Sequence, residues 1–207
     1  KPTITVYTDG SVGQTPLCSV GTASCVIYNG DDTSNPLYQT TTESGYFSTP
    51  YHAELHGLYT AITSATGHVP ANGDLYPTIL MVTDSESCLK ALKAGPYGHQ
   101  NPLMERFWEH LLSYLSTHTT TRVVYQHVFS HCGVDGNEAA DQAAAGAMAD
   151  SLANHAVSQS TIPIPIETIT AHIRATLRNR YSTSLTSPDH PYVSSARHQI
   201  CGEQLII

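Results

Sequence analysis

The chain has 207 residues, of which 40% are hydrophobic and 13% charged, enough for one well-packed domain with an appendage. The formal net charge is −8, and residues 1–150 carry 5 Lys or Arg against 14 Asp or Glu, which argues against strong nucleic-acid binding through phosphate contacts alone. Five scattered cysteines without a CxxC pair indicate no zinc site and favour an intracellular protein, and no apolar run has the length of a membrane span.

The first part of the chain carries three strand patterns in succession. Residues 3–8 alternate in polarity, with Ile4 and Val6 on one face of the predicted strand. Residues 21–28 and the threonine-rich residues 37–46 have the composition of two further strands, with turn residues at 29–32 between them. Because the three strands are close in sequence, we expect an antiparallel meander.

The pattern then changes to helices that alternate with strands. Pro50 suits the first turn of a helix that continues to about Thr66, and residues 78–83 form an apolar run typical of a central strand. The remaining predicted elements are helices at 85–94 and 102–116, a strand at 122–129 and a helix from Gly136 to about Asn154. The order β-β-β-α-β-α-α-β-α predicts an α/β fold, a mixed five-stranded sheet flanked by helices.

Residues 1–150 are expected to form one domain and residues 151–207 a C-terminal extension. The extension begins with a Pro/Ile linker and continues with helical spacing over residues 167–181, followed by an irregular tail. The chain begins at Lys1, directly before a strand and without Met. We therefore expect it to be a segment of a longer polypeptide.

Four acidic residues lie where predicted strands end or predicted helices begin. Asp9 ends the first strand and Asp84 the fourth, and carboxylates at the ends of neighbouring parallel strands meet at one sheet edge. Glu54 and Asp141 each lie about one turn into a helix that can point at the same edge. Clustered acids repel one another unless a cation neutralises them, and carboxylate oxygens suit Mg²⁺ or Mn²⁺. Two such ions can promote hydrolysis of a phosphodiester.

Taken singly, these acids have structural interpretations. Asp9-Gly10 alone is typical of a turn, Asp84-Ser85 alone of a helix N-cap, and an isolated Glu54 or Asp141 of a solvated helix surface. Their joint occurrence favours the metal site.

Two residues near Asp141 have different expected roles. Glu138 fits a capping box with Asp135 as the N-cap, which is a structural role. A lone histidine is more often structural, but His131 lies in a glycine-flanked loop beside the predicted acid cluster. We therefore expect His131 to act in proton transfer or product release.

Four motifs occur in a specific order: Tyr7-Thr8-Asp9-Gly10-Ser11, Ala53-Glu54-Leu55, Thr83-Asp84-Ser85, and His131-xx-Gly133-xxx-Asn137-Glu138-Ala139-Ala140-Asp141. In this order they resemble type 1 ribonuclease H domains from about Thr3 to Ala149. The resemblance implies a ribonuclease H-like fold with strand order 3-2-1-4-5. It also implies a two-metal endonuclease that hydrolyses the RNA strand of RNA–DNA hybrids. Asp9, Glu54, Asp84 and Asp141 would then hold two Mg²⁺ ions, which Mn²⁺ can replace, and His131 would be the flexible histidine.

The resemblance also bears on substrate contacts. Residues beside the acids are expected to touch the hybrid, namely Gly10, Ser11, Ser85 and Asn137. The Lys/Arg-rich helix that cellular members often carry is absent, because residues 95–101 read Gly-Pro-Tyr-Gly-His-Gln-Asn. Arg174, Arg178 and Arg180 are candidates to compensate for it. The alternative is a helix packed through Ile169, Ile173 and Leu177, with the arginines solvated.

Three shorter strings are similar to RNase H domains of non-LTR retrotransposon polyproteins: Leu92-Lys93-Ala94-Gly95-Pro96, Phe107-Trp108 and Ser130-His131-Cys132-Gly133-Val134. This resemblance implies a polyprotein that also contains a reverse transcriptase, and removal of RNA during reverse transcription. It further implies an intracellular location, in the cytoplasm, the nucleus or both. A host RNase H is the alternative origin.

A catalytically silent module of the same fold, which positions a polymerase or binds nucleic acid, is a second hypothesis. Such modules usually lose an acid, whereas all four positions are filled here. An exonuclease or a transposase-like enzyme is a third hypothesis, and the string from His131 to Asp141 argues against it.

Overall fold

The computed structural model describes residues 3–15, 19–68, 76–97 and 101–154, together with eight positions between 166 and 178. The chain divides into two compact units, Lys1–Pro165 and Ile166–Ile207. The first unit contains β1 (Thr3–Gln14), β2 (Ser19–Asn29), β3 (Tyr38–Tyr46), α1 (Pro50–Gly67), β4 (Thr78–Thr83), α2 (Glu86–Lys93), α3 (Pro102–Thr117), β5 (Arg122–His127) and α4 (Asp135–Asn154).

The five strands form one mixed sheet in the order β3-β2-β1-β4-β5, as predicted. β1, β2 and β3 pair antiparallel, whereas β4 lies parallel to both β1 and β5. In the parallel register Thr3 faces Thr78 and Tyr7 faces Val82, so both strands point their carboxyl ends at the same edge. This edge is where open α/β sheets bind ligands.

The C-terminal ends of β1 and β5 differ from the predictions, and the ends of β2 and β3 differ by one or two residues. β1 continues past Asp9 to Gln14, because Gly10–Gln14 pair with Ala23–Ser19 of β2. The prediction that Asp9 ends the strand is therefore wrong, although Asp9 does lie beyond the segment that pairs with β4. β5 ends at His127 rather than at residue 129. In both cases pairing with the neighbouring strand of the sheet decides the boundary, which the local composition of the strand does not reveal.

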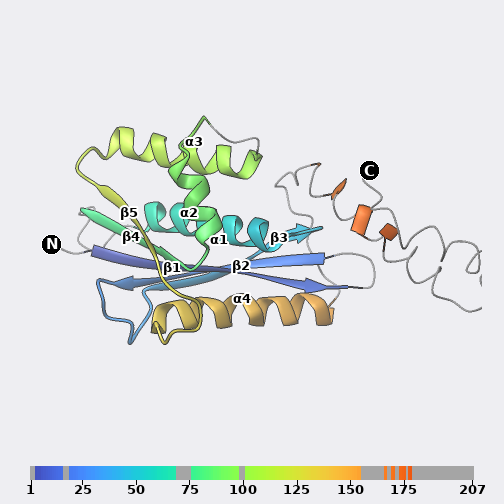
Figure 1. The fold of residues 1–207 in the computed structure, drawn as a ribbon. Coiled ribbons are helices and arrows are strands. Elements are labelled where there is room, and N and C mark those ends of the chain that lie inside the picture. Colours follow the sequence, from blue (N-terminus) through green and yellow to red (C-terminus); the bar gives the residue numbers. More distant parts are fainter. Residues whose placement is uncertain are drawn as a thin grey trace, which may run out of the picture. The chain divides into compact units, whose positions relative to one another are not determined.

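Helices cover both faces of the sheet (Figure 1). α1, α2 and α3 lie on one face and α4 on the other. The larger apolar core lies under α1 and α3 and contains Ile4, Val6, Leu58 and Phe107. A smaller core on the α4 side includes Tyr7, Val26, Tyr28, Val82 and Ala140. The alternation of Val6 and Tyr7 between the two cores follows from the period of two in a strand.

The alanine-rich composition of α4 lets its backbone lie close to the sheet. Ser24 Oγ on β2 donates to the carbonyl of Ala140 at 2.6 Å, and Thr22 Oγ1 donates to that of Ala144 at 2.8 Å. Through these bonds the buried hydroxyl groups of β2 find acceptors in the backbone carbonyls of α4. The same bonds fix the position of α4 along the sheet. They hold Asp141, the neighbour of Ala140, at a defined place over the strands.

In the second unit the described positions, which include Ile173 and Arg174, are helical. Arg180 and the predicted linker lie outside the described residues, except for Ser151–Asn154, which belong to α4, and Ile166, which is helical. Among the described residues, none of the helices is long and apolar enough to span a membrane.

Candidate metal centre

The backbone brings three of the predicted acids to one point. Asp9 lies two residues beyond the last β1 residue that pairs with β4, and Asp84 directly follows β4. α1 starts nearby, because Thr49 caps its N-terminus by accepting from the His52 N–H and Pro50 occupies its first turn. Glu54 therefore lies near the N-terminal end of α1, where the helix meets the sheet edge.

A close approach between β1 and α1 makes this convergence possible. A side chain at Gly10 would overlap the backbone of Ala53 and Glu54, and one at Gly57 would meet Thr8 Oγ1 and the carbonyl of Asp9. Because both residues lack a Cβ, the helix can lie directly against the strand that carries Asp9. Gly10, which the sequence predicts to contact the substrate, therefore also allows the close packing of α1 against β1.

Asp9, Glu54 and Asp84 each place a carboxylate oxygen within 4.8 Å of the other two. Asp9 is buried, and Glu54 and Asp84 are half-buried. Glu54 Oε2 is shielded from solvent and has no hydrogen-bond partner among the described residues. A buried carboxylate oxygen without a donor leaves a coordination position for a cation.

The pKa values of the clustered acids also indicate a site for a cation. Burial, together with the charges of Asp84 and Asp141, raises the pKa of Asp9 to about 7. Burial and the charges of Asp9 and Asp84 raise the pKa of Glu54 to about 9. A hydrogen bond from the Gly10 backbone opposes both shifts without cancelling them. The folded chain therefore resists full ionisation of this cluster unless a positive charge is present.

Asp141 lies in a neighbouring group with His131 and Glu138, whose ligand atoms also lie within 4.8 Å of one another. His131 Nδ1 is 3.9 Å from Asp141 Oδ2 and 3.8 Å from Glu138 Oε2. Since the charge of Asp141 raises the pKa of both Asp9 and Glu54, the two groups belong to one electrostatic site. The structure therefore gathers all four predicted acids and His131.

The loop before α4 differs from the capping prediction. α4 already begins at Asp135, so Asp135 is helical and is not the N-cap. Glu138 Oε1 instead accepts from the Gly133 N–H at 3.4 Å, while its other oxygen faces His131. Glu138 thus borders the site, which the sequence interpretation missed. Its spacing of three residues from Asp141 on one helix face was the available signal.

Asn137 has a different environment from the one expected of a substrate contact. Its side chain is only 2% exposed, and Nδ2 donates to Asp84 Oδ2 at 3.2 Å. This bond holds Asp84 from the opposite face of the sheet. Ser85 is likewise buried, as the N-cap of α2, whereas Ser11 stays partly exposed on β1.

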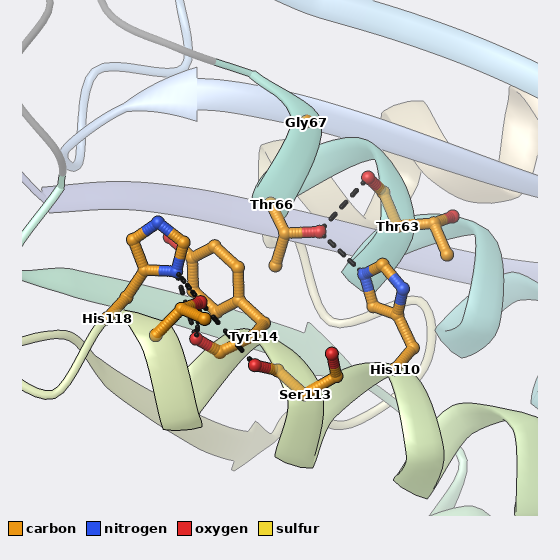
Figure 2. A pocket seen from close by; sticks show the side chains of 8 residues that line it. Thr63, Thr66, Gly67, His110, Ser113, Tyr114 and His118 are labelled. Atoms are coloured by element: carbon orange, nitrogen blue, oxygen red, sulfur yellow. Dashed lines mark hydrogen bonds between the residues drawn. The ribbon is translucent and has the colours of Figure 1, made fainter.

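A cavity lies at the far end of α1 from Glu54 (Figure 2). It has a volume of about 310 Å³ and lies between the end of α1 and α3, where Thr66 Oγ1 contacts His110 Nε2 at 2.7 Å. Among the described residues that line it there is no carboxylate, and Gly67 is 13 residues beyond Glu54, roughly 20 Å along a helix. This cavity is therefore separate from the acidic site.

The donor set suits divalent cations that prefer oxygen ligands. Asp9 on β1, Glu54 on α1, Asp141 on α4 and Asp84 directly after β4 offer carboxylates, and the like charges of the first cluster call for a neutralising ion. An acidic site at the carboxyl edge of a mixed α/β sheet is an arrangement that suits metal-dependent hydrolysis.

Comparison with known proteins identifies the class. The sequence model of the RNase H family matches residues 1–149. The chain belongs to the RNase H family, whose members use divalent metal ions, and it is a ribonuclease H, a nuclease of the hydrolase class. No curated protein sequence matched the chain.

Solved structures agree with the family fold. The N-terminal RNase H domain of a Mycobacterium tuberculosis protein is 19% identical, with a TM-score of 0.55, 75% of this chain covered and 100% of that one. RNase H1 of the archaeon Halobacterium salinarum is 21% identical, with a TM-score of 0.52 and coverages of 72% and 98%. LC11-RNase H1, solved in complex with an RNA/DNA hybrid, is 19% identical, with a TM-score of 0.54 and coverages of 72% and 99%.

Proposed function

We propose that this ribonuclease H hydrolyses the RNA strand of RNA–DNA hybrids at two divalent cations, Mg²⁺ or in its place Mn²⁺. The observation that carries the proposal is the convergence of Asp9, Glu54 and Asp84 within 4.8 Å, with a raised pKa at Asp9 and Glu54. The hybrid bound to the similar LC11-RNase H1 supports the substrate class.

Asp9, Glu54, Asp84 and Asp141 are the residues that would hold the ions. Bound divalent cations supply the positive charge that activates an attacking water and stabilises the leaving oxygen. Asn137 keeps Asp84 in place through its 3.2 Å hydrogen bond, and the Gly10 backbone does the same for Asp9 and Glu54. Cleavage leaves a 3′-hydroxyl and a 5′-phosphate.

His131 would move a proton near the leaving group. Its side chain is 70% exposed, and its backbone lies in the left-handed region with a φ of 54°. A non-glycine residue in this region marks a loop with a special conformation. One ring nitrogen lies 3.8 Å from Glu138 and 3.9 Å from Asp141, and the exposed ring would be open to the substrate.

Recognition of RNA in the hybrid requires contacts with 2′-hydroxyl groups in the minor groove. Ser11 and the backbone of Gly10 border the acids and are candidates for these contacts. Arg174 and Arg178, both exposed, would add phosphate contacts from the second unit. Replacing both with Glu weakens hybrid binding and flattens its salt dependence if they touch the backbone; unchanged binding contradicts that role.

The biological context is proposed from the sequence resemblance. The strings around Gly95, Trp108 and Cys132 support an origin in a retroelement polyprotein with a reverse transcriptase, where the domain removes RNA during reverse transcription. The location would then be intracellular, in the cytoplasm or nucleus.

Cleavage of a labelled RNA–DNA hybrid tests the function directly. The hybrid is compared with single-stranded RNA, an RNA duplex and a DNA duplex, each with Mg²⁺, with Mn²⁺ and with EDTA. Metal-dependent cutting of the RNA strand of the hybrid alone supports the proposal. Hybrid binding without cutting would instead support a catalytically silent module, which the presence of all four acids disfavours.

A further inference from the structure

The exposed aromatic ring of Phe129 is connected to the acid cluster through a single residue, His127. Phe129 follows the end of β5, and 74% of its surface is exposed. Its ring lies edge-on to that of His127, with 5.5 Å between centroids and an interplanar angle of 82°. His127 Nε2 in turn lies 3.2 Å from the backbone carbonyl of Asp84. Because a carbonyl oxygen only accepts, this nitrogen of His127 donates the hydrogen bond.

These contacts fix the ring relative to the acids. Phe129 packs on His127, and His127 is anchored on the residue that supplies one carboxylate of the cluster. The backbone adds a second tie, because the N–H of Val128 donates to the carbonyl of Thr83 at 3.1 Å. A single exposed apolar residue is ordinary on a protein surface. An exposed aromatic anchored to the site by two contacts is a ready platform for an apolar ligand surface.

The residues close to Phe129 in the sequence carry little positive charge with which to bind phosphates. Arg122 is the only Lys or Arg between residues 122 and 141, whereas Asp135, Glu138 and Asp141 lie in the same stretch. Residues 123–141 therefore offer a nucleic acid no lysine or arginine for its phosphates, and the exposed Lys90 on α2 is paired with Glu86 at 2.8 Å. In a duplex the base faces are stacked on one another, so an aromatic side chain meets the sugars along the groove, and this apolar contact needs no positive charge and depends on no particular sequence.

We propose that Phe129 is a substrate-positioning residue whose ring packs against a sugar of the bound hybrid beside the scissile position, with His127 supporting the ring. This inference rests on the proposed function. It attributes part of the affinity for the hybrid to apolar contacts that salt does not weaken. Such contacts suit a chain whose residues 1–150 are acidic.

Hybrid binding in an Asp9→Asn background tests the inference, because this variant keeps the nucleic acid uncut. Phe129→Ala is compared in that background with Phe129→Trp and with the control Tyr38→Ala. Tyr38 is also an exposed aromatic, but it lies on β3 at the opposite edge of the sheet. Dissociation constants are measured with Mg²⁺ between about 50 and 200 mM salt. Thermal unfolding and steady-state kinetics of the variants with Asp9 intact are measured in parallel.

The expected result for Phe129→Ala is roughly tenfold weaker binding, near the low end of what the burial of one aromatic side chain contributes. The slope of binding against salt stays unchanged, because no charge is removed. KM rises about as much while kcat and the unfolding temperature stay near those of the parent, Phe129→Trp restores binding, and Tyr38→Ala has no effect.

Two outcomes separate this inference from the function beneath it. If the parent binds the hybrid and Phe129→Ala binds within twofold of it, the role of Phe129 is refuted and the function stands. If the parent does not bind the hybrid at all, the proposed function fails and this inference fails with it.

Discussion

Replacing Asp9 with asparagine should stabilise the metal-free protein while abolishing its activity. Asp9 is buried, and burial with the neighbouring charges raises its pKa from 3.8 to about 7. A shift of about three units corresponds to about 4 kcal/mol at 1.36 kcal/mol per unit. Because Glu54 shares part of the same repulsion, we expect a gain of about 2–4 kcal/mol, since coupled groups are not additive. For a chain of this size that is roughly 5–15 °C in unfolding temperature.

The sign follows from proton uptake. In the unfolded chain Asp9 loses its proton near pH 4, whereas in the folded chain it keeps the proton until about pH 7. The stability of the parent therefore falls as the pH rises through this window, because the folded state binds more protons. The advantage of Asp9→Asn is absent near pH 4 and complete above about pH 7.

Thermal unfolding followed by circular dichroism, with EDTA at pH 4, 6 and 8, measures this difference. Asp150→Asn on the exposed surface of α4 is the matched control, because it removes the same charge away from the cluster. Mg²⁺ should stabilise the parent strongly and the variant weakly. The difference in stability between them therefore narrows or reverses when metal is added. A variant no more stable than the parent at pH 8 in EDTA, or full cleavage activity with Mg²⁺, would refute the assignment of Asp9.

Three further changes test the surroundings of the site. Asn137→Ala should lower divalent-ion affinity about 10–100-fold by calorimetry, because it frees Asp84 from its hydrogen bond; equal affinity would contradict the positioning role. Gly57→Ala should cost about 1–3 kcal/mol in urea unfolding and most of the activity, because it pushes α1 away from Asp9, whereas Gly146→Ala, where a Cβ meets open space, should not. Burial lowers the pKa of His56 to about 4, so the parent should lose up to about 3 kcal/mol as the pH falls from 6.5 to 4, and His56→Asn should lose less over the same range.

Local sequence patterns predicted most of the elements that the structure contains. The apolar run of β4 was predicted at its observed bounds, Thr78–Thr83, and Pro50 marked the start of α1. These signals depend on side-chain periodicity and on the fixed φ of proline, which act within a few residues. The extension of β1 beyond Asp9 could not be predicted this way, because it exists only through pairing with β2.

The sequence by itself determined which residue types could form the site: four acids placed near strand ends and helix starts, with a histidine in the loop before the last helix. Only the tertiary structure decided their environment. It buried Asp9, left Glu54 Oε2 without a donor, and gave Asp84 a hydrogen bond from Asn137 on the opposite layer. It also placed Phe129 and His127 at the edge of the cluster. The physical reason is that burial and coulombic repulsion depend on distances between residues far apart in the chain, which local periodicity does not encode.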